Sequence, residues 1–326
     1  MYLSPLTIGP LKLAGNIFAA PMAGYSDKAT RQLALEYGAN LAFTEMVSCE
    51  GLWRLSAKTQ PIMERADGEE NLAMQLFAGN VEALEKALPI ALTQKPQLID
   101  FNCGCPVNKV IKSGSGSALM QNSALFKELM HTLRQNVPAD IAVSVKFRSG
   151  WNFDSINYLQ IAELALNEGI NLITLHPRTR SQAYSGKADY NHLATLKKTF
   201  PQAIICGSGD LYTIEDVTKM FEQTGIDAVM IARGSIGNPF IYKQITEAAA
   251  GRTYNPTANE RYATALKHFE LALEYGNEGT VVREIKKHIL AYPKGIAGCA
   301  AFKGVFAPLL NKEEMLTLLK NTLATV

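Results

Sequence analysis

The chain has 326 residues, of which 47% are hydrophobic, and a formal net charge of +2. This length and composition indicate a globular protein with a large core, built as one large domain or as a large domain with a small companion. A net charge so close to zero neither requires nor excludes an anionic partner, so any case for nucleic-acid binding has to be local. The sequence contains no run of about 18 apolar residues, the length needed to span a bilayer, and residues 1–13 lack the features of a secretion signal. We therefore expect a cytoplasmic location.

The chain contains five cysteines, an odd number, at Cys49, Cys103, Cys105, Cys206 and Cys299. Their scatter through a chain without an export signal favours reduced thiols over a disulfide framework. A structural zinc site commonly uses two close pairs of Cys or His ligands, and the pair in "NCGCP" has no second pair at such spacing. We therefore expect no metal site.

Eight short apolar or β-branched runs recur along the chain, with helix-like stretches between them. They begin at Ile17, Leu41, Leu72, Leu98, Ile141, Leu172, Ala203 and Ala228. Near-continuous apolar strands are typical of a parallel sheet that is covered on both faces, and the intervals leave room for a crossover helix each time. The pattern predicts an α/β protein with a (β/α)₈ TIM barrel.

Several of the stretches between these runs have apolar residues at helical spacing. Two of them begin at Asn80 and Asn122, which are good helix-capping residues, and a third, beginning at Asp216, ends at Gly225. After about Thr246 the strand pattern stops, and a Gly/Pro/Asn break follows at 251–257. Only helices are expected beyond it, over 259–275, 281–292 and 312–323. We therefore predict a barrel domain at 1–245 and a small all-helical C-terminal domain at 246–326.

The working residues of such a barrel lie at the carboxyl ends of its strands, and these ends are unusually polar here. Gln75, Lys146 and His176 lie within the predicted third, fifth and sixth strands. Each needs a partner, because an unpaired buried charge or amide costs several kcal/mol. A bound polar ligand would satisfy them.

The last two strands end in "GSGD" and "ARGS", two glycine-containing turns. Gly207, Gly209 and Gly234 let the backbone approach a ligand, and exposed N–H groups there can bind a phosphate. Arg233 adds a guanidinium suited to two phosphate oxygens. The combination favours a phosphorylated cofactor, although glycines that merely make tight turns are the alternative.

Five segments follow one another across the predicted barrel, namely AAPMAGYSD, NCGCPVNKVIKSGSGSALM, VKFRSGW, LHPRTRSQAYSGKADY and CGSGD. A sixth, VVREIKKHILAYPKGIAG, lies in the tail. In this order they resemble the bacterial, flavin-dependent tRNA-dihydrouridine synthase family, and the tail segment resembles its helical RNA-binding domain. The resemblance covers nearly the whole chain, and the N-x-G-C-P element with its downstream glycines is its most specific part.

The resemblance implies an FMN cofactor, recharged by NADPH or NADH. The implied cofactor-binding residues are Pro21, Met22, Ala23, Gln75, Lys146 and His176, with Ser208, Gly209, Asp210, Ala232 and Arg233 at the phosphate end. Two of them depart from the family, which usually has Asn at the position of Ser208 and Gly at that of Ala232. We expect altered phosphate contacts rather than a lost site.

Cys105, the cysteine before the proline, is the catalytic acid that the resemblance implies. Reduction of uracil by hydride transfer to C6 leaves negative charge near C5, and a positioned thiol can protonate that carbon. A thiol with an ordinary pKa of about 8.5 is mostly protonated at neutral pH. Asn102 and Arg178 are expected to hold the uracil carbonyls, and Lys146 to lie near the electron-rich end of the reduced flavin. Cys103 and Cys206 are expected to be core thiols.

In the tail, Arg283, Lys286 and Lys287 recur at helical spacing, opposite an apolar stripe. A solvated helix face is the plain interpretation of such a cluster. The family resemblance instead predicts phosphate contacts with tRNA, and the target base would have to leave its stack to reach the barrel.

The leading hypothesis is therefore an enzyme that reduces particular D-loop uridines of tRNA to 5,6-dihydrouridine, acting as a monomer. One alternative is a small-molecule flavin reductase of the dihydroorotate dehydrogenase type, which would have no use for a basic tail. Another is a barrel that has lost catalysis and only binds RNA. The sequence does not predict which uridine is reduced.

Overall fold

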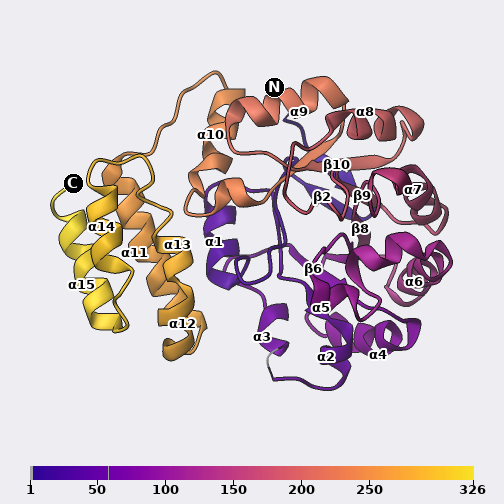
Figure 1. Cartoon of the computed structure of the whole chain (residues 1–326), viewed down its shortest axis with the longest axis horizontal. Coiled ribbons are helices and arrows are strands. Elements are labelled where there is room, and N and C mark those ends of the chain that lie inside the picture. The colour runs from indigo at the N-terminus through magenta and orange to yellow at the C-terminus, as the bar shows by residue number, and fades with distance from the viewer. Residues whose placement is uncertain (1–2, 58) are drawn as a thin grey trace.

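The computed structural model describes residues 3–57 and 59–326, and its centre is a closed barrel of parallel strands. The strands are β3 (Ile17–Ala19), β4 (Leu41–Phe43), β6 (Leu72–Phe77), β7 (Leu98–Cys103), β8 (Ala142–Arg148), β9 (Leu172–His176), β10 (Ile204–Ser208) and β11 (Ala228–Ile231). Neighbours follow in the order β4-β3-β11-β10-β9-β8-β7-β6, and pairing of β4 with β6 closes the ring. Each predicted run forms one of these strands, so the predicted TIM barrel is confirmed (Figure 1).

Helices connect successive strands and cover the outside of the barrel (Figure 1). They are α1 (Lys28–Glu36), α2 (Cys49–Trp53), α3 (Gln60–Met63), α4 (Val81–Leu92), α5 (Asn108–Ile111), α6 (Ser123–Asn136), α7 (Tyr158–Asn167), α8 (Tyr190–Thr199), α9 (Ile214–Thr224) and α10 (Phe240–Ala249). The side chains of Asn80 and Asn122 cap α4 and α6, each accepting a backbone N–H of the first turn. Gly225 ends α9 in the left-handed conformation, at a φ of 64°, which glycine adopts without a Cβ penalty.

An antiparallel hairpin of β1 (Leu6–Ile8) and β2 (Leu11–Leu13) precedes the barrel, and no sequence pattern predicted it. Ile8, Leu11 and Leu13 are buried in one cluster with the first residues of several barrel strands, including Leu41 and Leu98. The hairpin thus closes the amino-terminal end of the barrel with apolar side chains. A further two-residue strand, β5 (Val47–Ser48), pairs with β6.

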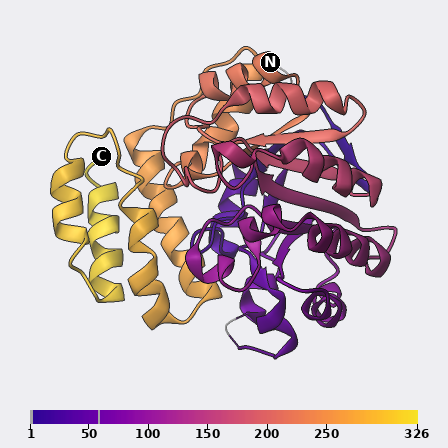
Figure 2. The ribbon, with the colours of Figure 1, turned by 45° about the vertical axis from the view of Figure 1, so that its right-hand side comes forward.

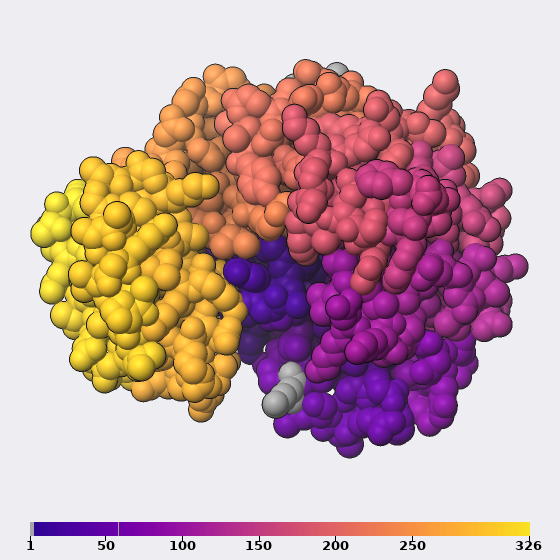
Figure 3. All heavy atoms as spheres, viewed as in Figure 1, coloured from indigo at the N-terminus to yellow at the C-terminus, as the bar shows by residue number. Residues whose placement is uncertain are grey.

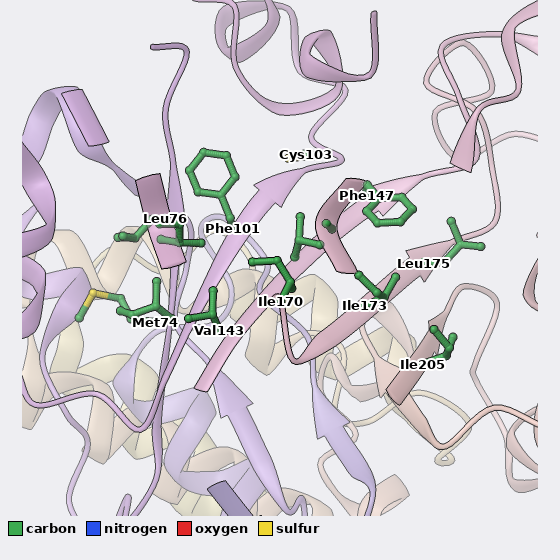
Figure 4. Packing of buried hydrophobic residues seen from close by; sticks show 14 of the residues in the cluster. Met74, Leu76, Phe101, Cys103, Val143, Phe147, Ile170, Ile173, Leu175 and Ile205 are labelled. Atoms are coloured by element: carbon green, nitrogen blue, oxygen red, sulfur yellow. The ribbon is translucent and has the colours of Figure 1, made fainter. Parts of the chain in front are cut away.

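Side chains along each barrel strand point alternately to the interior and to the surrounding helices. Figure 4 shows Phe101 and Cys103 of β7 in the core between sheet and helices, beside Met74 and Leu76 of β6. Cys103 has no exposed surface there, and Cys206 is likewise buried, so the prediction that both are core thiols is confirmed. The residues between the helix-facing positions face the barrel interior, and several of them are polar.

The tail contains helices α11 (Ala258–Tyr275), α12 (Glu278–Glu284), α13 (Lys286–Ile289), α14 (Cys299–Phe306) and α15 (Lys312–Leu323). The expected helices over 259–275 and 312–323 are confirmed to within a residue. The expected helix over 281–292 is instead two short helices, and the backbone N–H of His288 bonds to Ile285 only three residues back, which tightens the chain at the break.

The tail packs against one side of the barrel, next to α1 (Figures 1 and 2). The contact is apolar and aromatic, with Phe240 of α10 buried among Phe269 and Tyr292 of the tail. The boundary predicted between residues 245 and 246 falls inside α10, so the connection itself begins after Ala249. Among residues 3–57 and 59–326, no helix combines the length and the apolar character needed to cross a membrane.

Candidate active site

A pocket of about 420 Å³ lies at the carboxyl ends of the barrel strands. It brings together every residue for which we predicted a cofactor contact, namely Pro21, Met22, Ala23, Gln75, Lys146, His176, Ser208, Gly209, Asp210, Ala232 and Arg233. Asn102 and Cys105 line the same pocket. The size of the pocket lies within the usual range of small-molecule sites, and its lining combines apolar groups with a few polar ones, as such sites do.

Cys105 lies in the loop after β7, and its main chain is held from both sides. Its backbone N–H donates to Oδ1 of Asn102 at 3.0 Å, and the N–H of Gly104 donates to the same oxygen at 3.1 Å. Its carbonyl accepts the hydroxyl of Ser117 at 2.9 Å. At Gly116 a Cβ atom would lie 2.9 Å from that carbonyl oxygen, so only glycine fits there. These contacts fix the position from which the thiol projects.

The Cys105 thiol stays protonated at neutral pH. Burial raises its pKa above the usual thiol value, against a weaker opposing effect of Arg148 and Lys146. A neutral thiol at the edge of a pocket can donate a proton to a carbon that gains negative charge. Cys103, two residues earlier, faces the helices instead, so of the two cysteines only Cys105 reaches the pocket.

Lys146 is one of three cations that line the pocket, together with Arg148 and Arg233. Burial and the neighbouring Arg148 lower the pKa of its ammonium group to about 8, while Asp100 acts in the opposite direction. The group forms no hydrogen bond or close ion pair within the described part of the chain. Burial and the same cations hold the pKa of His176 well below its usual value, so its imidazole is neutral. The pocket therefore offers a desolvated ammonium group that Asp100 influences, but with which no anion of residues 3–57 and 59–326 forms a close ion pair.

The loops after β10 and β11 form the opposite end of the pocket. Gly209 and Asp210 both have positive φ values, of 128° and 53°, which turn the chain sharply. At Gly234 a Cβ atom would lie 2.0 Å from the carbonyl oxygen of Leu211, so the two loops touch there through bare backbone. Arg233 lies beside them, with its guanidinium 4.8 Å from the ring centroid of Tyr184. This end of the pocket thus combines sharply turned backbone with a guanidinium group, both of which are suited to binding an anion.

The predicted phosphate-end residue Asp210 serves a structural role through its carboxylate. Both of its oxygens accept from Nη2 of Arg178, at 2.8 and 2.7 Å, and one also accepts the backbone N–H of Ala188. The carboxylate is thereby neutralised, which reduces its repulsion of any bound anion. The hydroxyl of Ser208 donates to the carbonyl of Met230 on the neighbouring strand.

Arg178 has a different environment from the one we predicted. We expected it to hold a uracil carbonyl, but its guanidinium is buried among Asp210 and the carbonyls of Ser185 and Gly186, and it is not part of the pocket lining. Arg148 lines the pocket instead. Its Nε donates to the carbonyl of Gly104 at 2.8 Å, which ties it directly to the loop that carries Cys105.

The three basic tail residues do not form one free surface. Lys287 lies next to the barrel, 5.2 Å from the ring centroid of Tyr25, and pairs with Glu284. Lys286 donates to the carbonyl of Ala307 at 2.8 Å, whereas Arg283 is exposed. Val282, Ile285, Ile289 and Tyr292 are buried, which confirms the predicted apolar stripe.

A second cavity, of about 390 Å³, lies between the barrel and the tail. Gly24, Lys28 and Glu45 line it from the barrel, and Tyr275 and Lys287 from the tail. Figure 3 shows the surface hollowed between the orange and yellow tail and the barrel, with residues near the N-terminus at the bottom of the hollow. Tyr25 lines the barrel pocket, and its neighbours Gly24 and Ser26 line this cavity, so the two lie next to each other.

A family model described as dihydrouridine synthase (Dus) matches residues 18–325. The chain belongs to the dihydrouridine synthase family. Among its curated relatives, a probable tRNA-dihydrouridine synthase of Treponema pallidum is 36% identical over 90% of this chain and 89% of its own length. The tRNA-dihydrouridine synthase B of Pseudomonas aeruginosa is 33% identical over 95% of this chain and 93% of its own length.

Solved structures similar to this dihydrouridine synthase share its fold at low sequence identity. A 2-naphthoyl-CoA reductase complex matches with a TM-score of 0.59 and 13% identity, over 76% of this chain and 52% of the other. A variant of NCR from Zymomonas mobilis matches with a TM-score of 0.57 and 16% identity, over 80% of this chain and 94% of the other. The chain thus spans about half the length of the first of these and nearly all of the second. Both matches agree with a barrel fold.

For two residues of this dihydrouridine synthase the sequence predicted no function, although one lines the pocket and the other supports it from below. Arg148 is one of two cations on β8, and its role depends on the carbonyls of Gly104 and Ala183, which are far from it in sequence. Asp100 lies in the middle of β7, where an acidic residue in an otherwise apolar strand is a signal that could have been followed.

Proposed function

We propose that this dihydrouridine synthase reduces particular uridines in the D loop of tRNA to 5,6-dihydrouridine, with FMN as cofactor and NADPH or NADH as reductant. One observation supports the proposal above all: Asn102 and Cys105 line the same pocket as all the predicted cofactor residues. The names of the curated relatives, which are tRNA-dihydrouridine synthases, support tRNA as the substrate.

The pocket residues suit FMN. The buried ammonium group of Lys146 is costly without an anionic or polar partner, and the electron-rich end of a reduced flavin would supply one. Arg233 and the backbone around Gly209 suit a phosphate group, and Gly234 allows the two loops that carry them to lie in direct contact. When bound, FMN would carry hydride from the nicotinamide to C6 of the uracil.

The chain's own residues supply the proton and the orientation. The Cys105 thiol, protonated because burial raises its pKa, donates its proton to C5 and recovers one from solvent. The side-chain oxygen of Asn102 accepts the backbone N–H of Cys105, and one of its two amide N–H groups donates to Gln75. The second N–H is available to donate to a uracil carbonyl. At neutral pH Lys146, with its pKa near 8, is still mostly charged and stabilises negative charge developing nearby.

The tail supplies the contact with the RNA. Arg283, Lys286 and Lys287 hold tRNA phosphates by charge, and the target uridine leaves its stack to enter the barrel. The barrel, up to the end of α10 at Ala249, is then the FMN-binding catalytic domain, and the helices that follow form the tRNA-binding domain. The protein acts as a monomer in the cytoplasm, where its substrate is found.

The decisive experiment is mass-spectrometric mapping of dihydrouridine in tRNA from cells with and without this gene, together with the absorption spectrum of the purified protein. We expect flavin absorption and the loss of dihydrouridine at specific D-loop positions. A colourless protein that takes up no FMN, or unchanged tRNA, would refute the proposal. Reduction of a free pyrimidine without any action on tRNA would support the dihydroorotate dehydrogenase type instead.

A further inference from the structure

A buried acid lies directly beneath the pocket, and the proposed reaction does not use it. Asp100 has no exposed surface and faces the barrel interior from the middle of β7. It is in register with Gln75 of β6 and Ser144 of β8, so three polar side chains meet at one level of the barrel. The flanking residues Met74 and Phe101 instead belong to the hydrophobic core that the strands share with the helices, and Figure 4 shows both among its packed side chains.

A continuous chain of hydrogen bonds runs from this acid to the Cys105 loop. Gln75 donates through Nε2 to Oδ2 of Asp100 at 2.6 Å, and Asn102 donates through Nδ2 to Oε1 of Gln75 at 2.8 Å. Oδ1 of Asn102 then accepts the backbone N–H groups of Gly104 and Cys105. We call Asp100, Gln75 and Asn102 the amide chain.

The two ends of the amide chain determine its direction. An ionised carboxylate only accepts hydrogen bonds, and a backbone N–H only donates. Taken alone, each side-chain amide of Gln75 and Asn102 could rotate so that its oxygen and nitrogen exchange places. Between the carboxylate of Asp100 and the backbone N–H groups, however, only one orientation of the two amides gives every donor an acceptor. The reversed orientation would place an amide N–H group against the backbone N–H of Cys105, which would leave buried donors unpaired.

The charge of Asp100 suits this role. Burial raises the pKa of its carboxyl to about 6, and the hydrogen bonds from Gln75 and Ser144 and the nearby Lys146 oppose that rise, so it is ionised at neutral pH. Its other oxygen accepts the hydroxyl of Ser144 at 2.5 Å. Both carboxylate oxygens are therefore paired, and the anion is stable in the interior.

We propose that Asp100 is a positioning residue whose carboxylate orients Gln75 and Asn102, so that each turns its remaining amide N–H toward the ligand pocket while Asn102 holds the Cys105 loop. Gln75 then presents a donor to the cofactor and Asn102 a donor to the pyrimidine. The inference rests on the proposed function for the identity of those ligands, but the orientation of the amides follows from the hydrogen bonds alone.

Two substitutions separate hydrogen bonding from charge. Asp100→Ala removes the acceptor, and we expect the FMN dissociation constant to rise about 10-fold, as for the loss of one hydrogen bond to a charged group. Turnover per bound flavin falls about 10-fold as well, with an unchanged KM for tRNA, because Asn102 and the Cys105 loop lose their orientation. Asp100→Asn keeps an acceptor for Gln75 and is expected to stay within about 3-fold of the unsubstituted protein.

The matched control is Cys103→Ala, which shortens a buried side chain of the same strand on the face away from the pocket. It is expected to change neither FMN affinity nor turnover per flavin. If Asp100→Ala binds FMN and turns over like the control, Asp100 is merely structural and the inference is wrong. If Asp100→Asn is as impaired as Asp100→Ala, charge rather than orientation matters, and the inference is equally wrong.

A second pair of variants tests the chain without cofactor or substrate. Gln75→Glu sets one carboxylate against another and should lower the thermal midpoint of the apoprotein by about 4 °C. Adding Asp100→Asn restores a donor opposite the new acceptor and should recover most of that loss, whereas additive losses would overturn the inference. This test and the FMN affinities do not depend on tRNA reduction, so a failed proposed function is distinguishable from a failed amide chain.

Discussion

The side-chain oxygen of Asn102 accepts the backbone N–H of Cys105 at 3.0 Å, three residues further along the chain. The same amide donates to Gln75 on the neighbouring strand. A residue that faces the barrel interior therefore also sets the starting point of the loop that carries the thiol. The position of Cys105 depends in this way on the closed barrel and not on its own loop alone.

The two cysteines of the NCGCP segment should respond oppositely to substitution. Cys105→Ala removes the proposed proton donor, so the protein should bind flavin but form dihydrouridine at least about 100-fold more slowly. Cys103→Ala removes a buried sulfur from the helix-facing core and should cost only stability, on the order of 1 kcal/mol. Assays of dihydrouridine formation on tRNA, with flavin content measured alongside, test both. Activity in Cys105→Ala together with its loss in Cys103→Ala would reverse our assignment.

Gly234→Ala should weaken the binding of FMN. The added Cβ would lie 2.0 Å from the carbonyl oxygen of Leu211, so the two phosphate-end loops must move apart. We expect the FMN dissociation constant, measured by fluorescence titration, to rise about 10-fold, corresponding to roughly 1.4 kcal/mol. Gly304→Ala is the control, since a Cβ there meets no atom within 4 Å and the residue lies inside α14. An unaltered FMN affinity in Gly234→Ala would contradict the predicted phosphate position.

The basic tail residues should govern tRNA affinity and not the chemical step. Replacing Arg283, Lys286 and Lys287 together by alanine should raise the KM for tRNA about 10-fold or more and leave kcat nearly unchanged. The slope of log Kd against log salt concentration should fall by about 2 to 3, one for each lost phosphate contact.

The matched control carries the same change of charge elsewhere. Lys127, Lys198 and Lys219 are exposed on the outer helices of the barrel, and their replacement by alanine should leave the KM for tRNA within about 2-fold. Equal effects of the two triple variants would mean that net charge, and not these three tail residues in particular, attracts the RNA.

Acid should loosen the contact between barrel and tail. His268 contacts the hydroxyls of Thr30 and Tyr292 at 3.2 and 3.0 Å, and its ring lies 4.7 Å from that of His288. Burial lowers the pKa of both imidazoles below the usual value. Below about pH 6.5 the unfolded chain therefore takes up protons that the folded chain does not, so the free energy of unfolding falls as the pH falls.

Thermal unfolding between pH 7.5 and 5 measures this effect. Each neutral buried imidazole should cost about 1.4 kcal/mol for every pH unit below its ordinary pKa, until its pKa in the folded protein is reached. His268→Gln should reduce the decline, whereas His131→Gln, at an exposed position on α6, should not. A decline of equal size in both variants would show that other groups cause it.

Much of the barrel was predictable because its determinants are local. The eight apolar runs form its strands, since a strand buried on both faces requires a short apolar segment whatever its neighbours are. Asn80, Asn122 and Gly225 mark helix ends because capping involves residues only a few positions apart. The N-terminal hairpin was missed, since its three-residue strands are too short to show a period.

The sequence by itself determined the barrel, the cysteine that reaches the pocket and the family, because strand periodicity and contiguous motifs are written along the chain. Only the tertiary structure decided the partners of the charged residues. Arg178 pairs with Asp210, and Arg148 donates to the backbone carbonyl of Gly104, because closing the barrel brings together groups that are 32 and 44 residues apart. The physical reason is that buried charges must be paired, and which partner lies within reach depends on the register of the strands and not on proximity in sequence.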